Sequence, residues 1–467
     1  MQKSKIFILL PDGIGLRNYA FTNFFALGSA LGYDLTFWNI TAFDLKKLGF
    51  REIKITHSEL HPKTDLLKKA KALIELDITK KKTKDAIYDF YRHKLYFKSV
   101  KDVVKSVIIK TLEHTYSFSK IRKSLQAHER KTKYYHDCLE TLKAEKPELV
   151  FCTNHRTTKA LAPIAAAKDL GIPTATFIFS WDNLPKATKV IETDFYFVWS
   201  DHMKSELLSY YPYINENQVV VTGTTQFEPH YDENLIASRE VFFKSYKLLP
   251  SRKYICYSGD DITTSPNDPQ YLSDVADAVL ELNAKGHDLG IIFRRAPVDF
   301  SSRFDEVLKK YQEIITAVDP EWEVQGAVWN TVLPTKDDIT RQMNTIYHSE
   351  MVINLGSSMV FDYVAHDKPC AYINYDIPTS GHDHVSVKTI YNFVHFRSMT
   401  DRKAVIWLDR PEAIADEIEK VLSGNTQSVE YAKEWFKKIN LHPPQEASKR
   451  IFDAIGKIIS EKTHKST

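Results

Sequence analysis

The sequence lacks closely spaced cysteines. It contains four, Cys138, Cys152, Cys256 and Cys370, and no two of them form a CxxC pair. Three of the four lie in apolar, strand-like runs, so a disulfide framework and a cysteine-rich zinc site are both excluded. We interpret the cysteines as reduced core residues.

Long apolar runs and a strong net charge are also lacking. The run from Ile6 to Leu10 is short, Pro11 and Asp12 end it, and no later stretch is long enough to span a membrane. We therefore expect a cytoplasmic protein. Lys plus Arg number 63 and Asp plus Glu number 60, and this balance gives no case for a nucleic-acid partner.

The chain has instead the composition of a folded α/β protein. At 467 residues, with 43% hydrophobic and 26% charged residues, it is too long for one ordinary core. Strand-like runs alternate with helical patterns in both halves, which is typical of parallel sheets covered by helices on both faces. The expected strands are Lys5–Leu10, Tyr33–Trp38, Leu149–Thr153, Thr174–Ile178, Phe195–Trp199, Val219–Thr222, Tyr254–Tyr257, Gly290–Phe293, Met351–Asn354, Ala371–Ile373 and Val405–Trp407. The expected helices are Arg17–Leu31, Lys159–Leu170, Asp201–Tyr210, Pro269–Ala284, Asp337–His348 and Met359–Ala365.

This alternation predicts two doubly wound, Rossmann-like domains that face a ligand-binding cleft. The first domain is expected at residues 1–228 and the second at 229–440. A C-terminal helix within 441–467 is expected to pack back on the first domain. Pro229 and a polar cluster near Gln226 to Glu233 mark the boundary.

A helical insertion, residues 60–144, interrupts the first domain and is rich in Lys, Arg, Tyr and Phe. Its segment Lys98 to Leu112 has the pattern of a basic amphipathic helix, which can lie on an anionic membrane or dock a lipid-linked acceptor. Alternatively, the apolar stripe of the insertion packs on its own domain.

Polar residues follow three strands of the first half. After the first strand come Asp12, Arg17 and Asn18, where Asp12 could deprotonate an acceptor hydroxyl and the other two could orient it. Alternatively, Asp12 closes a turn. Asn154, His155 and Arg156 follow another strand, and Trp181, Asp182 and Asn183 follow the next. His155 and Asp182 are further catalytic candidates, although both are also common as helix caps or structural partners.

In the second half, small and basic residues at strand ends predict a phosphate site. Gly356, Ser357 and Ser358 leave the start of a helix open, with Asp362 one turn later. A serine cap on an ordinary helix is the alternative. Arg294 ends a strand and suits phosphate oxygens, and the loop with Gly259 and Asp260 follows the first strand of that domain.

A histidine-rich tract, Gly381-His382-Asp383-His384, precedes His395-Phe396-Arg397. Its spacing matches no standard zinc pattern, so we expect no metal and no other cofactor. His395 is better interpreted as an additional donor to the leaving phosphates.

The segment SEMVINLGSSMVFDYVAHDKP, Ser349 to Pro369, resembles the strand-turn-helix of CDP-glycerol glycerophosphotransferases and related GT-B transferases. The segments Phe177 to Ala187, Val219 to Glu228 and Val394 to Met399 are similar to those of bacterial surface-polysaccharide glycosyltransferases. This resemblance implies a metal-independent transferase that binds donor in its C-terminal domain and acceptor in its N-terminal domain. Carried over, the donor site falls on Arg294, Ser357, Ser358 and Asp362.

Two departures favour transfer of a sugar over transfer of a polyol phosphate: the tract Ser180 to Asn183 and the insertion have no counterpart in the polyol enzymes. The leading hypothesis is therefore a glycosyltransferase that moves a sugar from a nucleotide sugar to a surface polysaccharide or lipid-linked glycan. The alternatives are a CDP-polyol phosphotransferase, a sugar-nucleotide 2-epimerase, for which Asp260 and Asp261 supply acidic residues, and a non-catalytic glycan-binding scaffold.

Overall fold

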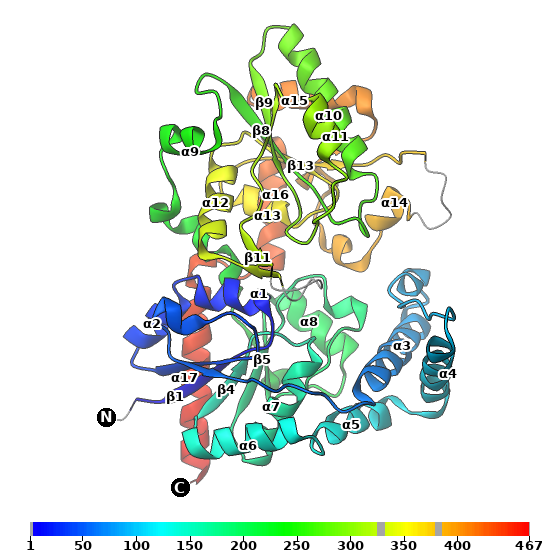
Figure 1. Ribbon diagram of the computed structural model, residues 1–467, viewed down its shortest axis with the longest axis vertical. Helices are drawn as coiled ribbons and strands as arrows, with labels where there is room; N and C mark the ends of the chain where they lie inside the picture. Colours follow the sequence, from blue (N-terminus) through cyan, green and yellow to red (C-terminus); the bar gives the residue numbers. More distant parts are fainter. Residues whose placement is uncertain (1–2, 325–331, 379–384, 467) are drawn as a thin grey trace. The chain divides into compact units, whose positions relative to one another are not determined.

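The structure of the protein, a computed structural model, describes residues 3–324, 332–378 and 385–466. The chain forms two compact units, and Figure 1 colours it from the N- to the C-terminus. Unit 1 comprises Met1–Thr225 with Ile439–Thr467, and unit 2 comprises Gln226–Lys438. Each unit has its own parallel sheet, as the sequence predicts. No helix in the described ranges is long and apolar enough to cross a membrane.

Unit 1 contains a seven-stranded parallel sheet with the order β3-β2-β1-β4-β5-β6-β7. Its strands are β1 (Lys5–Leu10), β2 (Asp34–Asn39), β3 (Glu52–Lys54), β4 (Leu149–Cys152), β5 (Thr174–Phe177), β6 (Phe195–Val198) and β7 (Val219–Val221). Every residue from Ile6 to Leu10 is fully buried, as expected for a central strand covered on both faces. The sequence did not predict β3, because its three residues, Glu-Ile-Lys, form no apolar run.

The helices of unit 1 outside the insertion are α1 (Gly13–Gly15), η1 (Leu16–Ala20), α2 (Phe24–Ala30), α7 (Leu161–Asp169), α8 (Asp201–Tyr210) and α17 (Ala447–Ser466). Short 3-10 turns are η2 (Leu45–Leu48), η4 (Thr158–Ala160), η5 (Leu184–Lys186), η6 (Glu216–Gln218) and η13 (Pro444–Glu446).

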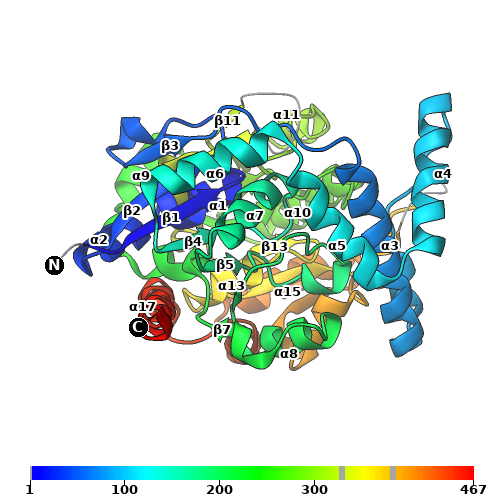
Figure 2. The ribbon, with the colours of Figure 1, turned by 90° about the horizontal axis from the view of Figure 1, so that it is seen from below.

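The prediction of one helix over Arg17–Leu31 is wrong. The chain makes the π-helical turn η1, breaks, and restarts as α2. Thr22 Oγ1 donates a hydrogen bond of 2.9 Å to the carbonyl of Asn18, which a continuing helix would reserve for the Thr22 amide. The restarted helix meets the C-terminus of the chain: Phe24 on α2 stacks on Phe452 of α17 with ring centroids 4.5 Å apart, and Figure 2 shows the two helices side by side.

The insertion in unit 1 forms α3 (Thr64–Thr83), η3 (Ala86–Asp89), α4 (Val100–Thr115), α5 (Phe118–Glu129) and α6 (Lys133–Glu145). Ser99, Ser117 and Thr132 cap α4, α5 and α6, each accepting a hydrogen bond from an amide in the first turn. Leu67 of α3 and Leu125 of α5 share one core with the helix α7 that covers the sheet. Through these residues the insertion packs on its own unit.

Unit 2 contains a six-stranded parallel sheet with the order β10-β9-β8-β13-β14-β15, and a separate antiparallel pair. The sheet strands are β8 (Lys253–Ser258), β9 (Leu289–Arg294), β10 (Ile315–Ala317), β13 (Val352–Asn354), β14 (Cys370–Ile373) and β15 (Ile406–Leu408); the pair is β11 (Trp322–Val324) and β12 (Val332–Pro334). The helices are α9 (Arg239–Tyr246), α10 (Asp268–Ala284), α11 (Asp305–Lys310), α12 (Lys336–Tyr347), α13 (Met359–Val364), α14 (Val387–Ile390), α15 (Ile414–Leu422) and α16 (Gln427–Ile439). Short 3-10 turns are η7 (Thr225–Tyr231), η8 (Glu233–Leu235), η10 (Val394–Ser398), η11 (Arg402–Ala404) and η12 (Pro411–Ala413).

Both sheets reverse their winding direction at one point. In unit 1 this switch lies between β1 and β4, and in unit 2 between β8 and β13. Ligands of open α/β sheets bind outside the carboxyl ends of the strands at such a switch, because the neighbouring loops diverge there. The loops after these four strands are therefore the candidate ligand-binding loops, and the sequence singled out all four.

All four cysteines are buried and form no disulfide bond, as expected.

Candidate functional site

Asp12 follows β1 at the switch point of unit 1 and is almost fully buried. Its Oδ2 accepts a hydrogen bond from Nδ2 of Asn154, and its buried Oδ1 has no hydrogen-bond partner among the described residues. Burial raises the pKa of the Asp12 carboxyl to about 6, although Asn154 and the nearby amides of Gly15 and Ile14 lower it. A carboxyl that exchanges its proton near neutral pH suits a general base, and this role of Asp12 stays a prediction.

Arg156 lies beside this carboxyl because β1 and β4 are paired neighbours, with Leu9 opposite Cys152. The Arg156 amide donates to Oδ1 of Asn154 at 2.8 Å. Its half-buried guanidinium lies 5.7 Å from the ring centre of Phe179 and makes no hydrogen bond to a described residue. Burial lowers the pKa of Arg156, and the charges of Asp182 and Asp12 partly restore it. Unit 1 therefore holds a partly exposed cation between two carboxylates.

A second cation of unit 1, Lys68 on α3, comes from the insertion. Burial lowers the pKa of Lys68, and the positive charge of Arg156 lowers it further. Lys68 makes no ion pair with a described residue, whereas its neighbour Lys69 pairs with Asp65 at 2.9 Å. An anionic ligand that bound both half-buried cations would offset their mutual repulsion. No sequence pattern connects residues 68 and 156, so Lys68 was missed.

His155, a catalytic candidate, is fully buried in unit 1. Neither ring nitrogen makes a hydrogen bond of normal geometry with a described residue, and the ring lies 5.5 Å from that of Phe179. Burial holds the pKa of His155 well below its ordinary value, with the charges of Arg156 and Lys189 adding to the effect. Its carbonyl accepts the Val190 amide at 2.9 Å. The position fits a neutral packing residue, and a catalytic role of His155 stays a prediction.

Asp182, the third catalytic candidate, is tied into its own turn after β5. It accepts hydrogen bonds at Oδ1 from Ser180 (2.5 Å) and Asn183 (2.9 Å), and Oδ2 forms an ion pair with Lys186. These contacts fit the alternative that Asp182 organises the turn. The predicted acceptor residues Trp181 and Asn183 are buried in the same turn, at 6% and 2% exposure.

The other two predicted acceptor residues lie on η1. The carbonyl of Asn18 accepts hydrogen bonds from Thr22 and, at 2.7 Å, from Thr225, so the Asn18 backbone joins two distant segments of unit 1. Asn18 is 4% exposed, whereas Arg17 is partly exposed. Single π-helical turns are frequent at functional sites, so of the two Arg17 is the better placed to meet a ligand.

Arg294 ends β9 in unit 2 and is 6% exposed. Its Nη2 pairs with Oδ1 of Asp338 at 2.6 Å, and Asp338 also accepts from the indole Nε1 of Trp322 at 2.7 Å. The buried Nη1 of Arg294 has no hydrogen-bond partner among the described residues. A buried donor of this kind is costly unless something accepts its hydrogen bond. Nη1 of Arg294 is thus a donor that no acceptor among the described residues satisfies.

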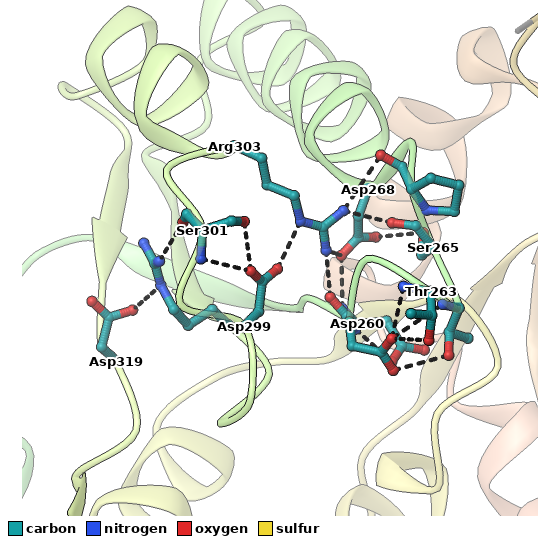
Figure 3. A network of polar contacts seen from close by, with 12 residues as sticks. Asp260, Thr263, Ser265, Asp268, Asp299, Ser301, Arg303 and Asp319 are labelled. Atoms are coloured by element: carbon teal, nitrogen blue, oxygen red, sulfur yellow. Dashed lines mark hydrogen bonds and ion pairs between the residues drawn. The ribbon is translucent and has the colours of Figure 1, made fainter. Parts of the chain in front are cut away.

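The loop after β8, which holds Gly259 and Asp260, is tied down by a polar network (Figure 3). Asp268 accepts hydrogen bonds from the Asp260 amide (2.7 Å) and the Tyr257 hydroxyl (2.7 Å). Arg303 donates to the carbonyls of Asp260 and Ser265 and pairs with Asp299 at 2.7 Å. The loop is therefore a rigid element with fixed backbone.

Within that loop, burial raises the pKa of Asp260 to about 7, and the negative charges of Asp268 and Asp261 add to the shift. Burial also raises the pKa of Asp268 to about 6. A Cβ at Gly259 would lie 3.1 Å from Asp268 Oδ2 and 3.2 Å from the ring of Phe293. Gly259 therefore serves close packing inside unit 2, and its contact with a donor stays a prediction.

Gly356, Ser357 and Ser358 join β13 to α13 and are partly exposed. Gly356 adopts φ +67, and a Cβ there would lie 3.0 Å from Phe396, which explains why glycine occupies the turn. The Ser357 amide donates to Asn354 Oδ1 at 2.8 Å, and the Ser358 side chain makes no capping hydrogen bond. Ser357 Oγ, however, accepts the Met359 amide at 3.3 Å, so the serine-cap alternative is supported at Ser357 and not at Ser358. Contact of either serine with phosphate stays a prediction.

Asp362 lies on α13, buried, and its Oδ1 is 2.8 Å from Nε2 of His230. Nδ1 of His230 is in turn 3.0 Å from Nε2 of His366. Burial lowers the pKa of His366 to about 4, and His230 lowers it further. Asp362 is thus held by a histidine pair that the sequence did not single out, because 132 residues separate Asp362 from His230. Its contact with a donor stays a prediction.

His395 is 8% exposed on η10, where its carbonyl accepts from the Ser398 hydroxyl at 2.5 Å. The tract Gly381-His382-Asp383-His384 lies outside the described residues. Within residues 3–324, 332–378 and 385–466, no group of three or more His, Cys, Asp or Glu side chains could hold a metal ion.

No protein-family model matches the sequence, and no curated protein matches it. Solved structures match it along nearly its whole length. A protein from Listeria monocytogenes assigned as a UDP-N-acetylglucosamine 2-epimerase is 12% identical, with a TM-score of 0.56 over 98% of this chain and 97% of that one. The S. aureus MnaA structure with UDP is 13% identical, with a TM-score of 0.53 over 98% and 97%. A glycosyltransferase from Rickettsia africae ESF-5 is 12% identical, with a TM-score of 0.53 over 98% and 99%. At these identities the similarity concerns the fold, and with its two parallel Rossmann-like sheets the chain has the GT-B fold.

Proposed function

We propose that the protein is a glycosyltransferase that moves a sugar from a nucleotide-sugar donor to a surface polysaccharide or lipid-linked glycan. The observation that carries the proposal is the buried Nη1 of Arg294, which has no hydrogen-bond partner among the described residues. It lies at the carboxyl end of β9, next to the switch point of unit 2. Negative charge develops on the departing diphosphate as the glycosidic bond breaks. A guanidinium that Asp338 already holds in place stabilises that charge without reorganising.

The other unit 2 residues complete a donor site in this proposal. Ser357 and Ser358 donate hydrogen bonds to phosphate oxygens, and Gly356 lets the chain turn towards them. The rigid loop with Gly259 and Asp260 presents backbone groups to the nucleotide, and His395 adds a donor. No metal takes part in the proposed reaction.

Unit 1 binds the acceptor in this proposal. Asp12 removes the proton of the attacking hydroxyl, and its pKa of about 6 leaves it mostly ionised at neutral pH. Arg156 and Lys68 hold a phosphate or carboxylate of the acceptor, whose negative charge offsets the repulsion between the two cations. A nucleotide-sugar donor implies a reaction in the cytoplasm.

A second candidate function is 2-epimerisation of a nucleotide sugar. It is favoured by Asp260, whose pKa of about 7 suits proton exchange at neutral pH and which is followed by a second carboxylate, Asp261. The fold neighbour from Listeria monocytogenes is also assigned to this reaction. An epimerase converts the nucleotide sugar alone, whereas a glycosyltransferase also needs an acceptor. A reaction with and without acceptor therefore distinguishes the two functions.

The test is a thermal-shift panel of UDP, CDP, GDP, CMP and dTDP, because a ligand of the folded state raises its melting temperature. UDP is the first nucleotide to try, because the S. aureus neighbour was solved with UDP. Arg294→Lys keeps a charge for Asp338 but removes the second arm of the fork. The matched control is Arg295→Lys, since Arg295 pairs with Asp319 at 2.9 Å.

We expect one nucleotide to stabilise the wild type and Arg295→Lys but not Arg294→Lys or Ser358→Ala. The corresponding sugar nucleotide is then incubated with and without a glycan acceptor, and the products are identified by NMR. A C2-inverted sugar formed without acceptor would replace the first function by the second, and a selective response to CDP would favour polyol-phosphate transfer. No response to any nucleotide would refute all three enzymes in favour of a scaffold.

A further inference from the structure

The outward face of α4 in the insertion is apolar. Five β-branched residues on this helix are between 39% and 82% exposed: Val100, Val103, Val104, Val107 and Ile108. Their spacing of three and four residues places them on one face. Ser106 and Ile109 on the opposite face are 3% and 2% exposed. The helix therefore carries apolar residues towards the core and towards the outside.

Helix formation does not explain these residues. β-branched side chains lose rotamer freedom in a helix, so a helix exposed to water gains nothing from four valines and an isoleucine. Single exposed apolar residues are common, whereas a continuous group of them marks a binding surface. Tyr96 and Phe97, just before α4, are each 58% exposed and extend the apolar segment along the chain.

Among the described residues of unit 1, no other element covers this face. In Figures 1 and 2, α4 lies at the outer edge of unit 1, and α3 lies between it and the sheet. The Ser106 hydroxyl donates to the carbonyl of Tyr96 at 2.9 Å and fixes the preceding segment against the inward side of α4. The apolar face is thus held by its own unit and turned away from it.

The charged residues around the apolar face are mostly lysines. Residues 94–110 contain five lysines and a single acidic residue, Asp102, which accepts the Ser99 hydroxyl at 2.7 Å in the first turn. Helical geometry places Lys101 and Lys105 along one edge of the apolar face and Lys110 along the other. An apolar centre with lysines at both edges matches a lipid surface, whose phosphates lie above its acyl chains.

We propose that α4 docks the protein on an anionic lipid surface, with its outward apolar side chains at the acyl boundary and its lysines against the lipid phosphates. The inference rests on the exposure and charge of α4 and is independent of the proposed reaction. It gives the insertion a function that core packing alone does not account for.

The test is co-sedimentation of the purified full chain with vesicles, either of phosphatidylcholine alone or with phosphatidylglycerol added. Val104→Gln combined with Val107→Gln removes part of the apolar centre. Val241→Gln is the matched control, because Val241 is 58% exposed on α9, a helix of unit 2. Lys101→Gln with Lys105→Gln removes two edge charges, and Lys449→Gln with Lys457→Gln, on α17, is its control.

We expect binding to phosphatidylglycerol vesicles that weakens with salt. The valine pair should weaken it by about tenfold or more, and the lysine pair by about fivefold for each charge, while the controls bind as the wild type. All substituted side chains are exposed, so melting temperatures should change little. Absence of binding at low salt, or binding that the valine pair leaves unchanged, would overturn the proposal. A dimer that the valine pair dissociates, without vesicle binding, would assign the surface to a second copy of the chain instead.

Discussion

Asn154 donates a hydrogen bond from Nδ2 to Oδ2 of Asp12, across 142 residues of chain. The Oδ1 of the same amide accepts the backbone amide of Arg156. One side chain therefore holds the proposed base and the loop that carries the neighbouring cation. The pairing of β1 with β4 makes this contact possible, because it brings the ends of both strands to one edge of the sheet.

Asp12→Asn should abolish turnover and leave the nucleotide response of unit 2 nearly intact, because an amide cannot take up the acceptor proton. The measurement is kcat with the donor found in the nucleotide panel, together with the thermal shift of the variant. Asp44→Asn, on an exposed turn, serves as control. Undiminished turnover of the Asp12 variant would remove Asp12 from the mechanism.

The same substitution should change the dependence of stability on pH. The pKa of Asp12 is about 6 in the fold and 3.8 as its reference value, so the folded state favours the protonated form. This contribution is fully present below pH 3.8 and is lost as the pH rises through 6. Asp12→Asn should therefore gain stability relative to the wild type between pH 4 and pH 7, by about 3 kcal/mol at most. Urea unfolding at several pH values measures it, and a constant difference would contradict the burial argument.

The sequence predicted the parts of the fold that depend on local patterns. Buried strands such as β1 and β9 are continuous apolar runs, and their bounds were close to those observed. The helix proposed for Arg17–Leu31 failed because a tertiary hydrogen-bonding role of the Asn18 carbonyl ends the regular pattern. Strand β3 was not predicted because three residues at the edge of a sheet are too few to show a periodic pattern.

The candidate site was predictable to the extent that strand ends carry function in open sheets. Asp12, Asn154 and Arg294 were singled out in this way, and their functional roles stay predictions. Lys68 and His230 were not, because each meets its partner only after distant segments fold together. Asp338, the partner of Arg294, likewise lies 44 residues further along the chain.

Arg156→Gln and Lys68→Gln should each raise the KM for an anionic acceptor by roughly tenfold or more, the order expected for losing one charged hydrogen bond. Lys68→Gln should not lower stability, because no ion pair is lost and a repulsion between the two cations is removed. Arg156→Gln also loses the attraction of Arg156 to Asp182 and Asp12, so it should lower stability slightly. Steady-state kinetics and thermal melting test both statements. Lys69→Gln is the matched control on the same helix, since Lys69 pairs with Asp65. Equal effects of Lys68→Gln and Lys69→Gln on KM would exclude a specific anion site.

Asp268→Ala should destabilise unit 2 by about 3 kcal/mol, because it leaves a buried tyrosine hydroxyl and the Asp260 amide without their acceptor. It should also weaken nucleotide binding, since the loop with Gly259 and Asp260 loses its clamp. Asp274→Ala on the same helix α10 is the control, because Asp274 accepts only peripheral contacts from Gln270 and Tyr375. Chemical unfolding and the nucleotide panel are the measurements, and unchanged nucleotide affinity would show that the loop does not contact the donor.

The contact of His366 with His230 predicts a loss of stability in acid. The pKa of His366 is about 4 in the fold and 6.5 as its reference value, so unfolded chains take up a proton that the folded chain resists. Stability from this source is fully present above pH 6.5 and is lost as the pH falls towards 4. His366→Gln can still donate to Nδ1 of His230 but does not titrate, so it should lose less stability over this range, by about 2 kcal/mol after allowance for the partial exposure of His366. Thermal melting between pH 4 and pH 7 measures the difference, with the exposed His136→Gln as control. If His366→Gln follows the wild type as closely as His136→Gln does, the histidine pair is not the acid-sensitive element of the fold.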